Sequence, residues 1–414
     1  QYGGKYAATI LDDLRSLPTL ALSLPIADLF GPSGIYTNSQ NRGVLWERSA
    51  SAELILPDGS TGFQVNAGLR MQGGAFRSHG LTKKHSFRLL FKRAHGPAKL
   101  RYRLFDDPGA TASFDTLTVR ANANDGWQWD AAAGNALYVR DSFCRETALD
   151  MGAVASHEVF VHLYLDGIYW GLYDIVERPD AAFSATYFGG RKEEWDAVTQ
   201  NGVSDGDARA WTAFLTLAVR GFATAAAYQA AMGNGPDGTD DPALERYLDP
   251  PNLIDYMIVN LYGGNGDWPH NNWWVGRRRV ESTGFKFYMW DAEWTLGLQS
   301  DLNANQTGVS SGVAAPYNAA RANPEFRMAF ADRLQRCLLA PGGALYVDPR
   351  NPAWDPLRPE RNAPASRFQR LAGTVERAIV AESARWGDQH APSRPYTRDE
   401  HWRPARDSLL RSYF

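Results

Sequence analysis

The first part of the chain alternates apolar and polar positions in short runs, which is the pattern of β-strands with one buried face. Turn residues such as Pro57-Asp58-Gly59-Ser60 separate the runs. Asp166-Gly167 joins two of the runs as a hairpin. The pattern predicts strands over residues 19–24, 52–56, 62–71, 85–91, 116–120, 159–165 and 168–176.

One helix is expected among these strands, over residues 135–151, with Gly152 ending it. Val139, Phe143 and Leu149 fall on one face of this helix. Glu146 shares that face, so the spacing predicts a carboxylate on the buried side of the helix.

After Pro179 the periodicity becomes helical, and Pro251 suits the first turn of one helix. The helices that we predict cover residues 208–219, 251–262, 325–338 and 365–385, and a hairpin over 273–280 and 285–290 interrupts them. We therefore expect an α+β fold, with a strand-rich lobe over residues 1–178 and a mainly helical lobe over residues 179–414. Together the two lobes would form one domain.

Composition adds few constraints. Hydrophobic residues make up 44% of the 414 and charged residues 21%, which suits a globular chain with a substantial core. The net charge of -3 gives no basic field for nucleic acid, and no apolar run approaches the ~20 residues of a membrane span. We expect a monomer. The 14 tryptophans are compatible with an extracytoplasmic protein, but the sequence does not decide the compartment.

Cys144 and Cys337 are the two cysteines of the chain. Two cysteines exclude a disulfide scaffold and a cysteine-based metal site. Two buried thiols are the favoured interpretation, and one disulfide stays open as the alternative.

A polar loop follows the predicted helix 251–262 and carries Asp267, with Asn272 five residues later. Phosphoryl transfer needs a carboxylate that receives or orients the proton of a hydroxyl, and an amide oxygen that holds a metal ion. The spacing brings both groups to one loop. Because Asp and Asn are also common in turns, a plain turn remains the alternative.

Two further residues extend this hypothesis. Asp291 ends an apolar strand, 24 residues after Asp267, where it could hold magnesium. Lys84 begins the predicted strand 85–91 and could reach nucleotide phosphates, with Glu146 as an ion-pair partner. A solvated strand end and an exposed surface lysine are the alternatives.

The segment around Gly73 and Gly74 completes the set, because glycines between strands let backbone amides approach phosphate, and Arg70 or Arg77 could add charge. The parts follow the order of a protein kinase: glycine loop, strand lysine, helix with a glutamate, hairpin, D-x-x-x-x-N and strand-end aspartate.

Residues 68–74, 84–89 and 166–178 resemble the spore-coat protein H (CotH) kinase family, and Asp267 to Asn272 and Trp290-Asp291 match its later motifs. The resemblance extends over residues 17–297. It is most specific in Gly167-Ile168-Tyr169-Trp170-Gly171-Leu172-Tyr173.

The resemblance implies an atypical, two-lobed protein-kinase-like enzyme that uses ATP and Mg²⁺ (or Mn²⁺) to phosphorylate Ser or Thr of a protein. It implies that Asp267 and Lys84 are catalytic, that Lys84 contacts the phosphates, and that Asn272 and Asp291 hold the metal. A spore-surface or cell-surface location in a bacterium would fit this resemblance. Residues 176–178 would form the hinge that reads adenine, with Glu177 and Arg178 at the nucleotide.

The chain departs from ordinary kinases at two motifs. Asn265-Gly266 precede Asp267 in place of His-Arg, and Ala292-Glu293 follow Asp291 in place of Phe-Gly. We therefore do not expect regulation through a phosphorylated activation loop. Two other functions stay open: a kinase-like enzyme that transfers AMP or ligates another group, and an inactive structural or binding module. The acceptor protein is not identified by the sequence.

Overall fold

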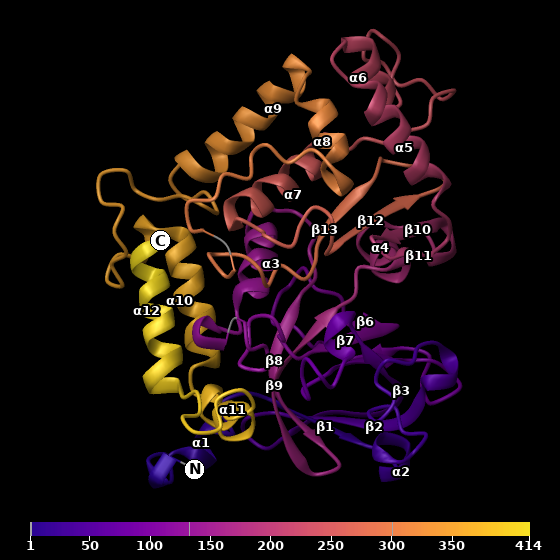
Figure 1. Ribbon diagram of the computed structural model, residues 1–414. Helices are drawn as coiled ribbons and strands as arrows, with labels where there is room; N and C mark the ends of the chain where they lie inside the picture. The colour runs from indigo at the N-terminus through magenta and orange to yellow at the C-terminus, as the bar shows by residue number, and fades with distance from the viewer. Residues whose placement is uncertain (1, 132, 300) are drawn as a thin grey trace. The chain divides into compact units, whose positions relative to one another are not determined.

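The computed structural model describes residues 2–131, 133–299 and 301–414 (Figure 1). Its contacts divide the chain into two compact units. The barrel unit consists of Gln1–Val139, His157–Arg178 and Gln369–Leu409. The helical unit consists of Arg140–Ser156, Pro179–Phe368 and Leu410–Phe414. The units are therefore not the two contiguous lobes of the sequence-based prediction.

A closed barrel of seven strands forms the centre of the barrel unit, in the order β1-β2-β3-β4-β7-β9-β8. Neighbouring strands are antiparallel except β1 and β8, which close the barrel in parallel. The strands are β1 Thr19–Ser23, β2 Arg48–Ile55, β3 Thr61–Gln72, β4 Ser86–Leu90, β7 Thr116–Arg120, β8 Glu158–Leu165 and β9 Ile168–Glu177. A separate pair, β5 Leu100–Arg101 and β6 Ser113–Phe114, completes the unit's strands among the described residues.

Alternation along the strands sets the two faces of the barrel, as the sequence predicted. Phe87 and Leu89 of β4 point into the apolar core with Val119 of β7. Arg88 is on the other face of β4, because successive side chains of a strand point to opposite sides. The predicted strands are all confirmed, with bounds that differ by a few residues.

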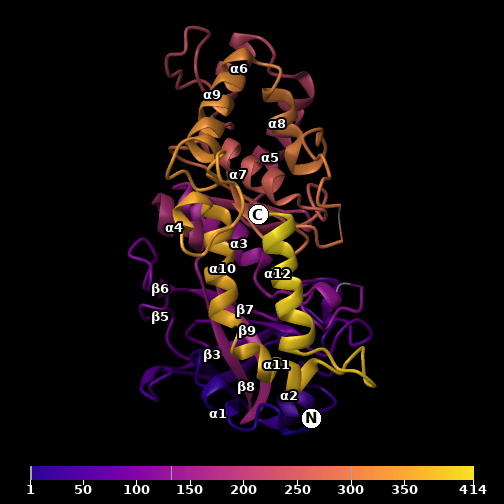
Figure 2. The same cartoon turned by 90° about the vertical axis from the view of Figure 1, so that its left-hand side faces the viewer.

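Helices from both ends of the chain pack on the barrel unit. They are α1 Ile10–Asp13, α2 Ile26–Phe30, α11 Ala378–Trp386 and most of α12 Arg403–Ser412. α11 packs against β9 and α1 (Figure 2). The single helix predicted over residues 365–385 is two helices, α10 Ala363–Val375 and α11, and the change of unit falls inside α10.

The helical unit combines helices with a small sheet. Its helices are α3 Arg140–Asp150, α4 Ala181–Phe188, α5 Arg209–Arg220, α6 Ala225–Ala231, α7 Pro250–Gly263, α8 Ala315–Ala320 and α9 Pro324–Leu334. Its sheet has the order β11-β10-β12-β13, with β10 Trp195–Thr199, β11 Gly202–Asp205, β12 Trp273–Arg278 and β13 Lys286–Met289. The predicted hairpin is β12–β13, whereas β10 and β11 were not predicted.

α7 is the central helix of this unit and packs against α3, α9 and β13. The Asp249 side chain caps its first turn by accepting from the amide of Asn252 at 3.2 Å, and two prolines follow at the start of the helix. Gly264 ends the helix in the left-handed conformation. The chain thus leaves α7 directly into the loop that carries Asp267.

The structure also describes the two cysteines and the length of the helices. Cys144 and Cys337 are both buried free thiols, so the disulfide alternative is excluded. No helix among residues 2–131, 133–299 and 301–414 combines the length and the hydrophobicity that crossing a bilayer requires.

Candidate active site

The loop between α7 and β12 is held in place from two sides. The amide of Gly266 donates to the carbonyl of Trp294 at 2.8 Å, which ties the loop to the segment after β13. The indole of Trp268 donates to the Tyr256 hydroxyl of α7 at 2.7 Å. Asp267 lies between these two anchors, so its backbone has a fixed position in the helical unit.

Two side-chain amides orient the carboxylate of Asp267. Asn271 Nδ2 donates to Oδ1 at 3.0 Å, and Asn272 Nδ2 donates to Oδ2 at 2.9 Å. His270 Nε2 lies 3.4 Å from Oδ1. The Asp267 side chain is 25% exposed, so a ligand in solution can reach it. Each carboxylate oxygen keeps capacity to accept a further hydrogen bond.

Asp291 lies at the same end of the β12–β13 hairpin. The register pairs Trp273 with Met289, so Asn272 lies opposite Trp290 at the end of the paired strands, and Asp291 follows one residue later. Both have left-handed backbones, with φ of 58° and 56°, and both are partly exposed. The structure therefore brings Asp267, Asn272 and Asp291 to one end of this hairpin.

A buried charge on α3, which sequence reasoning missed, supports this end of the hairpin. Asp141 Oδ1 accepts from the amide of Ala292 at 2.9 Å, and its other oxygen bonds Arg145 one turn along the helix. Both side chains are buried, whereas Glu146 is only partly buried. Val139 and Phe143 of the predicted apolar face are buried as expected, but the buried carboxylate of α3 is that of Asp141 and not that of Glu146.

Lys84 is fully buried in the barrel unit, with a side-chain exposure of 0%. Its Nζ donates to Glu382 Oε1 at 2.8 Å and to the carbonyl of Leu172 at 2.6 Å. Glu382 was given no role by the sequence. Glu146 belongs to the helical unit, so the Lys84–Glu146 pair stays a prediction. Lys84 already has a carboxylate partner in Glu382.

The glycine segment after β3 is partly open. Gly73 has φ of 112°, a conformation that favours glycine, and Gly74 is exposed with open space where a Cβ would stand. Arg77, in the short 3-10 helix that follows, is buried and donates to the carbonyls of Ser39 and Asn41. Arg77 is thus used inside the fold.

Arg70 is bound to a buried carboxylate. Its Nε donates to Glu47 Oε2 at 2.6 Å, and Glu47 also contacts Lys92 at 2.5 Å and His95 at 2.6 Å. Burial pushes the pKa of Glu47 up, but hydrogen bonds from Lys92 and His95 and the charge of Arg70 outweigh it, and the pKa is lowered. Arg70 and Lys92 carry two positive charges against the single negative charge of Glu47, so these three side chains are net positive.

The outer face of the barrel carries a polar row. The register places Arg70 opposite Arg88, Arg88 opposite Thr118, and Arg120 opposite Asp174. Directly opposed residues of neighbouring strands share a face and interact. Thr118, Arg120 and Asp174 of this row are buried, whereas Arg70 and Arg88 are partly exposed.

Glu177 ends β9, and its carboxylate accepts from the His157 amide at 2.9 Å and lies 2.7 Å from Nδ1 of the same residue. Its side chain is only 3% exposed. Arg178 follows, partly exposed, as the last residue of this part of the barrel unit. Adenine recognition at these residues stays a prediction. It would rely on backbone groups, because the Glu177 carboxylate is already bonded to His157.

The sequence of this chain matches the model of a known protein family. A family model described as "CotH kinase protein" matches residues 69–340, which is more than half of the chain. A solved structure described as the Helicobacter pylori proinflammatory kinase CtkA is similar at 10% sequence identity and a TM-score of 0.26, over 75% of this chain and 88% of that one. A search of curated proteins found no match.

Proposed function

The chain belongs to the CotH kinase protein family, as its sequence motifs indicated, and we propose that it transfers the γ-phosphoryl group of ATP to Ser or Thr hydroxyls of a protein in a magnesium-dependent reaction. The proposal includes a two-lobed kinase-like fold, with the barrel unit binding nucleotide and the helical unit carrying the catalytic carboxylate. Family membership supports a kinase-like activity, and the geometry around Asp267 supports the specific reaction.

The pair of amide hydrogen bonds to Asp267 is the observation that carries the proposal. A plain turn needs no partly exposed carboxylate held on both oxygens by the side chains of Asn271 and Asn272. Such a carboxylate is oriented before any substrate arrives, which is how positioned groups contribute to catalysis. The backbone anchors at Gly266 and Trp268 add to this orientation.

In the proposed reaction, Asp267 accepts a hydrogen bond from the acceptor hydroxyl. The hydroxyl oxygen forms a bond to the γ-phosphorus, the bond from that phosphorus to the β–γ bridging oxygen breaks, and ADP leaves. The hydroxyl proton passes to Asp267. Because each Asp267 oxygen already accepts one amide hydrogen bond, the direction of the remaining capacity is fixed relative to Asn271 and Asn272.

The residues at the hairpin end fit a magnesium ion. Mg²⁺ is bound in such sites by one or two protein oxygens together with phosphate and water. Asn272 donates its Nδ2 to Asp267, which leaves its Oδ1 for a metal, and Asp291 supplies a carboxylate. The described residues contain no cluster of three or more His, Cys, Asp or Glu, in keeping with a metal that depends on phosphate oxygens. Magnesium, when bound, neutralises charge on the transferring phosphate.

We propose that the phosphates bind near the Gly73-Gly74 segment, where the positive region around Arg70 favours an anion. Residues 176–178 remain the proposed adenine contact. A phosphate could reach Lys84 only if its pair with Glu382 opened, because neither side chain is exposed.

The test is incubation of the protein with manganese or magnesium and ATP labelled either at the γ- or at the α-phosphate, together with a peptide library rich in Ser and Thr. Phosphoryl transfer predicts labelled peptide or protein from γ-labelled ATP only. Label from the α-position would instead identify AMP transfer. Absence of transfer, together with a melting temperature that Mg-ATP leaves unchanged, would identify a binding module, because specific binding must stabilise the fold.

A further inference from the structure

A fully buried ion pair joins two parts of the barrel unit that are far apart in the sequence. Lys84 precedes β4, and Glu382 lies on α11, 298 residues later. Both side chains have 0% exposure. Lys84 Nζ also lies 4.7 Å from the ring centroid of Tyr173 and 5.4 Å from that of Tyr138. A buried lysine keeps its charge only where a counter-charge and hydrogen bonds compensate the loss of water, and Glu382 and the Leu172 carbonyl supply both.

Glu382 uses both carboxylate oxygens. Oε1 accepts from Lys84 and from the side-chain amide of Gln128, and Oε2 accepts from the amide of Leu172 at 2.7 Å. These donors come from the start of β4, the loop after β7, and β9. In the barrel, β7 lies between β4 and β9, so the pair links two strands that are not hydrogen-bonded neighbours in the sheet.

α11 contacts the segment of β9 in which the resemblance to the family is most specific. Trp386 Nε1 donates to the carbonyl of Trp170 at 2.6 Å, next to the Leu172 contacts with Glu382 and Lys84. Gly171 lies between them, and a Cβ there would stand 2.7 Å from Glu382 Oε2. The motif is therefore the docking site of a helix that lies outside the matched residues 69–340.

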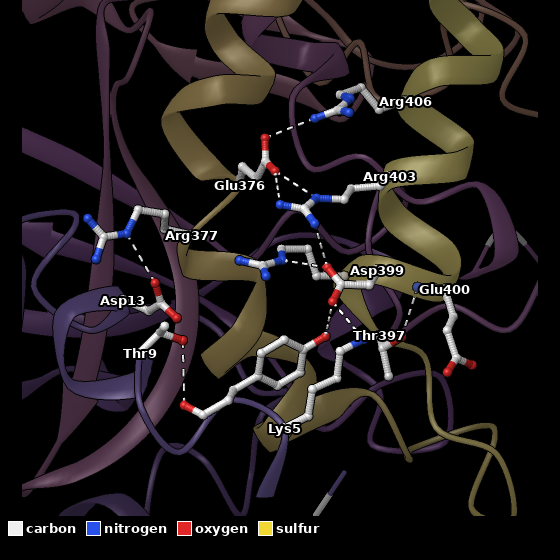
Figure 3. Close-up of polar contacts among 12 residues, drawn as sticks. Lys5, Thr9, Asp13, Glu376, Arg377, Thr397, Asp399, Glu400, Arg403 and Arg406 are labelled. Carbon is white, nitrogen blue, oxygen red and sulfur yellow. Dashed lines mark hydrogen bonds and ion pairs between the residues drawn. The ribbon is translucent and has the colours of Figure 1, made fainter.

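A second set of contacts holds the same C-terminal segment against the N-terminus of the chain (Figure 3). Asp399 accepts from the Tyr6 hydroxyl at 2.9 Å and contacts Lys5 at 2.8 Å and Arg403 at 2.9 Å. Glu376 contacts Arg403 as well, at 2.5 Å. These groups are partly exposed, so each pair contributes little to stability. The buried pair is where a substitution should matter.

We propose that Glu382 is a positioning residue of the nucleotide-binding unit. Its carboxylate holds Lys84 and locks β4 to β9, the strands whose outer faces carry Arg88 and Asp174. Protein kinases require an ion pair between a strand lysine and a helix glutamate. In this chain the glutamate comes from a helix that follows the catalytic residues, and the pair acts from within the fold without touching the nucleotide. This inference rests on the proposed function.

The experiment compares three variants with the wild type: Glu382→Gln, the double variant Lys84→Met/Glu382→Leu, and Glu376→Gln as a control on the exposed network. Mg-ATP affinity and the KM values for ATP and acceptor are measured at a temperature at which each protein is folded. Glu382→Gln should weaken Mg-ATP binding by about tenfold or more and leave the acceptor KM unchanged. Glu376→Gln should match the wild type.

The double variant shows whether the pair acts by holding the strands in position or by direct contact of Lys84 with the nucleotide. It also keeps the test decisive if Glu382→Gln does not fold. Apolar side chains often replace a buried ion pair without loss of stability, so the double variant should fold and recover most of the affinity and the kcat. A folded double variant without transfer would overturn the inference, because Lys84 would then contact the nucleotide. Wild-type affinity in Glu382→Gln would also overturn it. A wild type that does not bind Mg-ATP would overturn the proposed function and the inference together.

Discussion

Replacing Gly171 by alanine should destabilise the barrel unit far more than the same change at Gly167 in the same hairpin. Both glycines have positive φ, 138° and 81°. A Cβ at Gly171 would stand 2.7 Å from Glu382 Oε2, 2.9 Å from Trp386 Nε1 and 3.0 Å from Lys84 Cε. A Cβ at Gly167 would meet nothing within 4 Å.

The magnitudes follow from these distances. An L-residue with positive φ costs about 1–2 kcal/mol, and both variants bear this cost. Overpacking of a close contact adds about 1–3 kcal/mol, and only Gly171→Ala bears it, because α11 has to move away from β9. The free energy of unfolding should therefore fall by about 2–5 kcal/mol for Gly171→Ala and by about 1–2 kcal/mol for Gly167→Ala.

Urea unfolding followed by tryptophan fluorescence measures the difference, since Trp170 and Trp386 lie at the contact with ring centroids 5.7 Å apart. At an equal m-value, the midpoint of Gly171→Ala should lie clearly below that of Gly167→Ala. Equal midpoints would refute the reasoning, because they would mean that α11 does not close on the hairpin.

Two further predictions concern the loop that carries Asp267 and the dependence of stability on pH. Gly312→Ala should lower the transfer rate by at least about tenfold, because its Cβ would stand 2.5 Å from the carbonyl oxygen of Pro269, two residues after Asp267, and a shift of ~1 Å at a catalytic group can cost about 100-fold. Gly308→Ala has open space at its Cβ and should keep the wild-type transfer rate. Equal transfer rates in the two variants would contradict this reasoning. Burial lowers the pKa of His85 and of His162 from 6.5 to about 4. As the pH falls, these histidines therefore bind protons in the unfolded chain before they do so in the folded chain. The stability that is present above pH 6.5 should be lost as the pH falls toward 4, by up to about 3 kcal/mol per histidine. Melting temperatures between pH 7 and 4 should show this fall, less steeply in His162→Gln, and a flat profile would contradict it.

The parts of the fold that the sequence predicted are those with local signals. Alternation identified the barrel strands, Asp166-Gly167 identified the β8–β9 turn, and Pro251 marked the start of α7. The proximity of Asp267 and Asn272 likewise followed from five residues of spacing within one loop. Such features depend on neighbours in sequence, so a single chain suffices to see them.

The parts that escaped prediction depend on distant residues. β1 closes the barrel by pairing in parallel with β8, and no local pattern encodes a partner so far along the chain. The partner of Lys84 lies on a late helix and resembles any other glutamate of an amphipathic helix in the sequence. On α3, a buried Asp141–Arg145 pair looks like a solvated pair of charges, which is why the apolar stripe led to Glu146.

The most direct test of the central claim is γ-phosphoryl transfer by Asp267→Asn beside Asp291→Ala, with Mg-ATP binding measured for both. Asp267→Asn keeps the shape of the side chain but loses the group that receives the hydroxyl proton, a contribution of about 100- to 10,000-fold. We expect that Asp267→Asn loses transfer and keeps Mg-ATP affinity, whereas Asp291→Ala loses magnesium-dependent affinity. Transfer at the wild-type rate by Asp267→Asn would contradict the claim that Asp267 is the catalytic carboxylate.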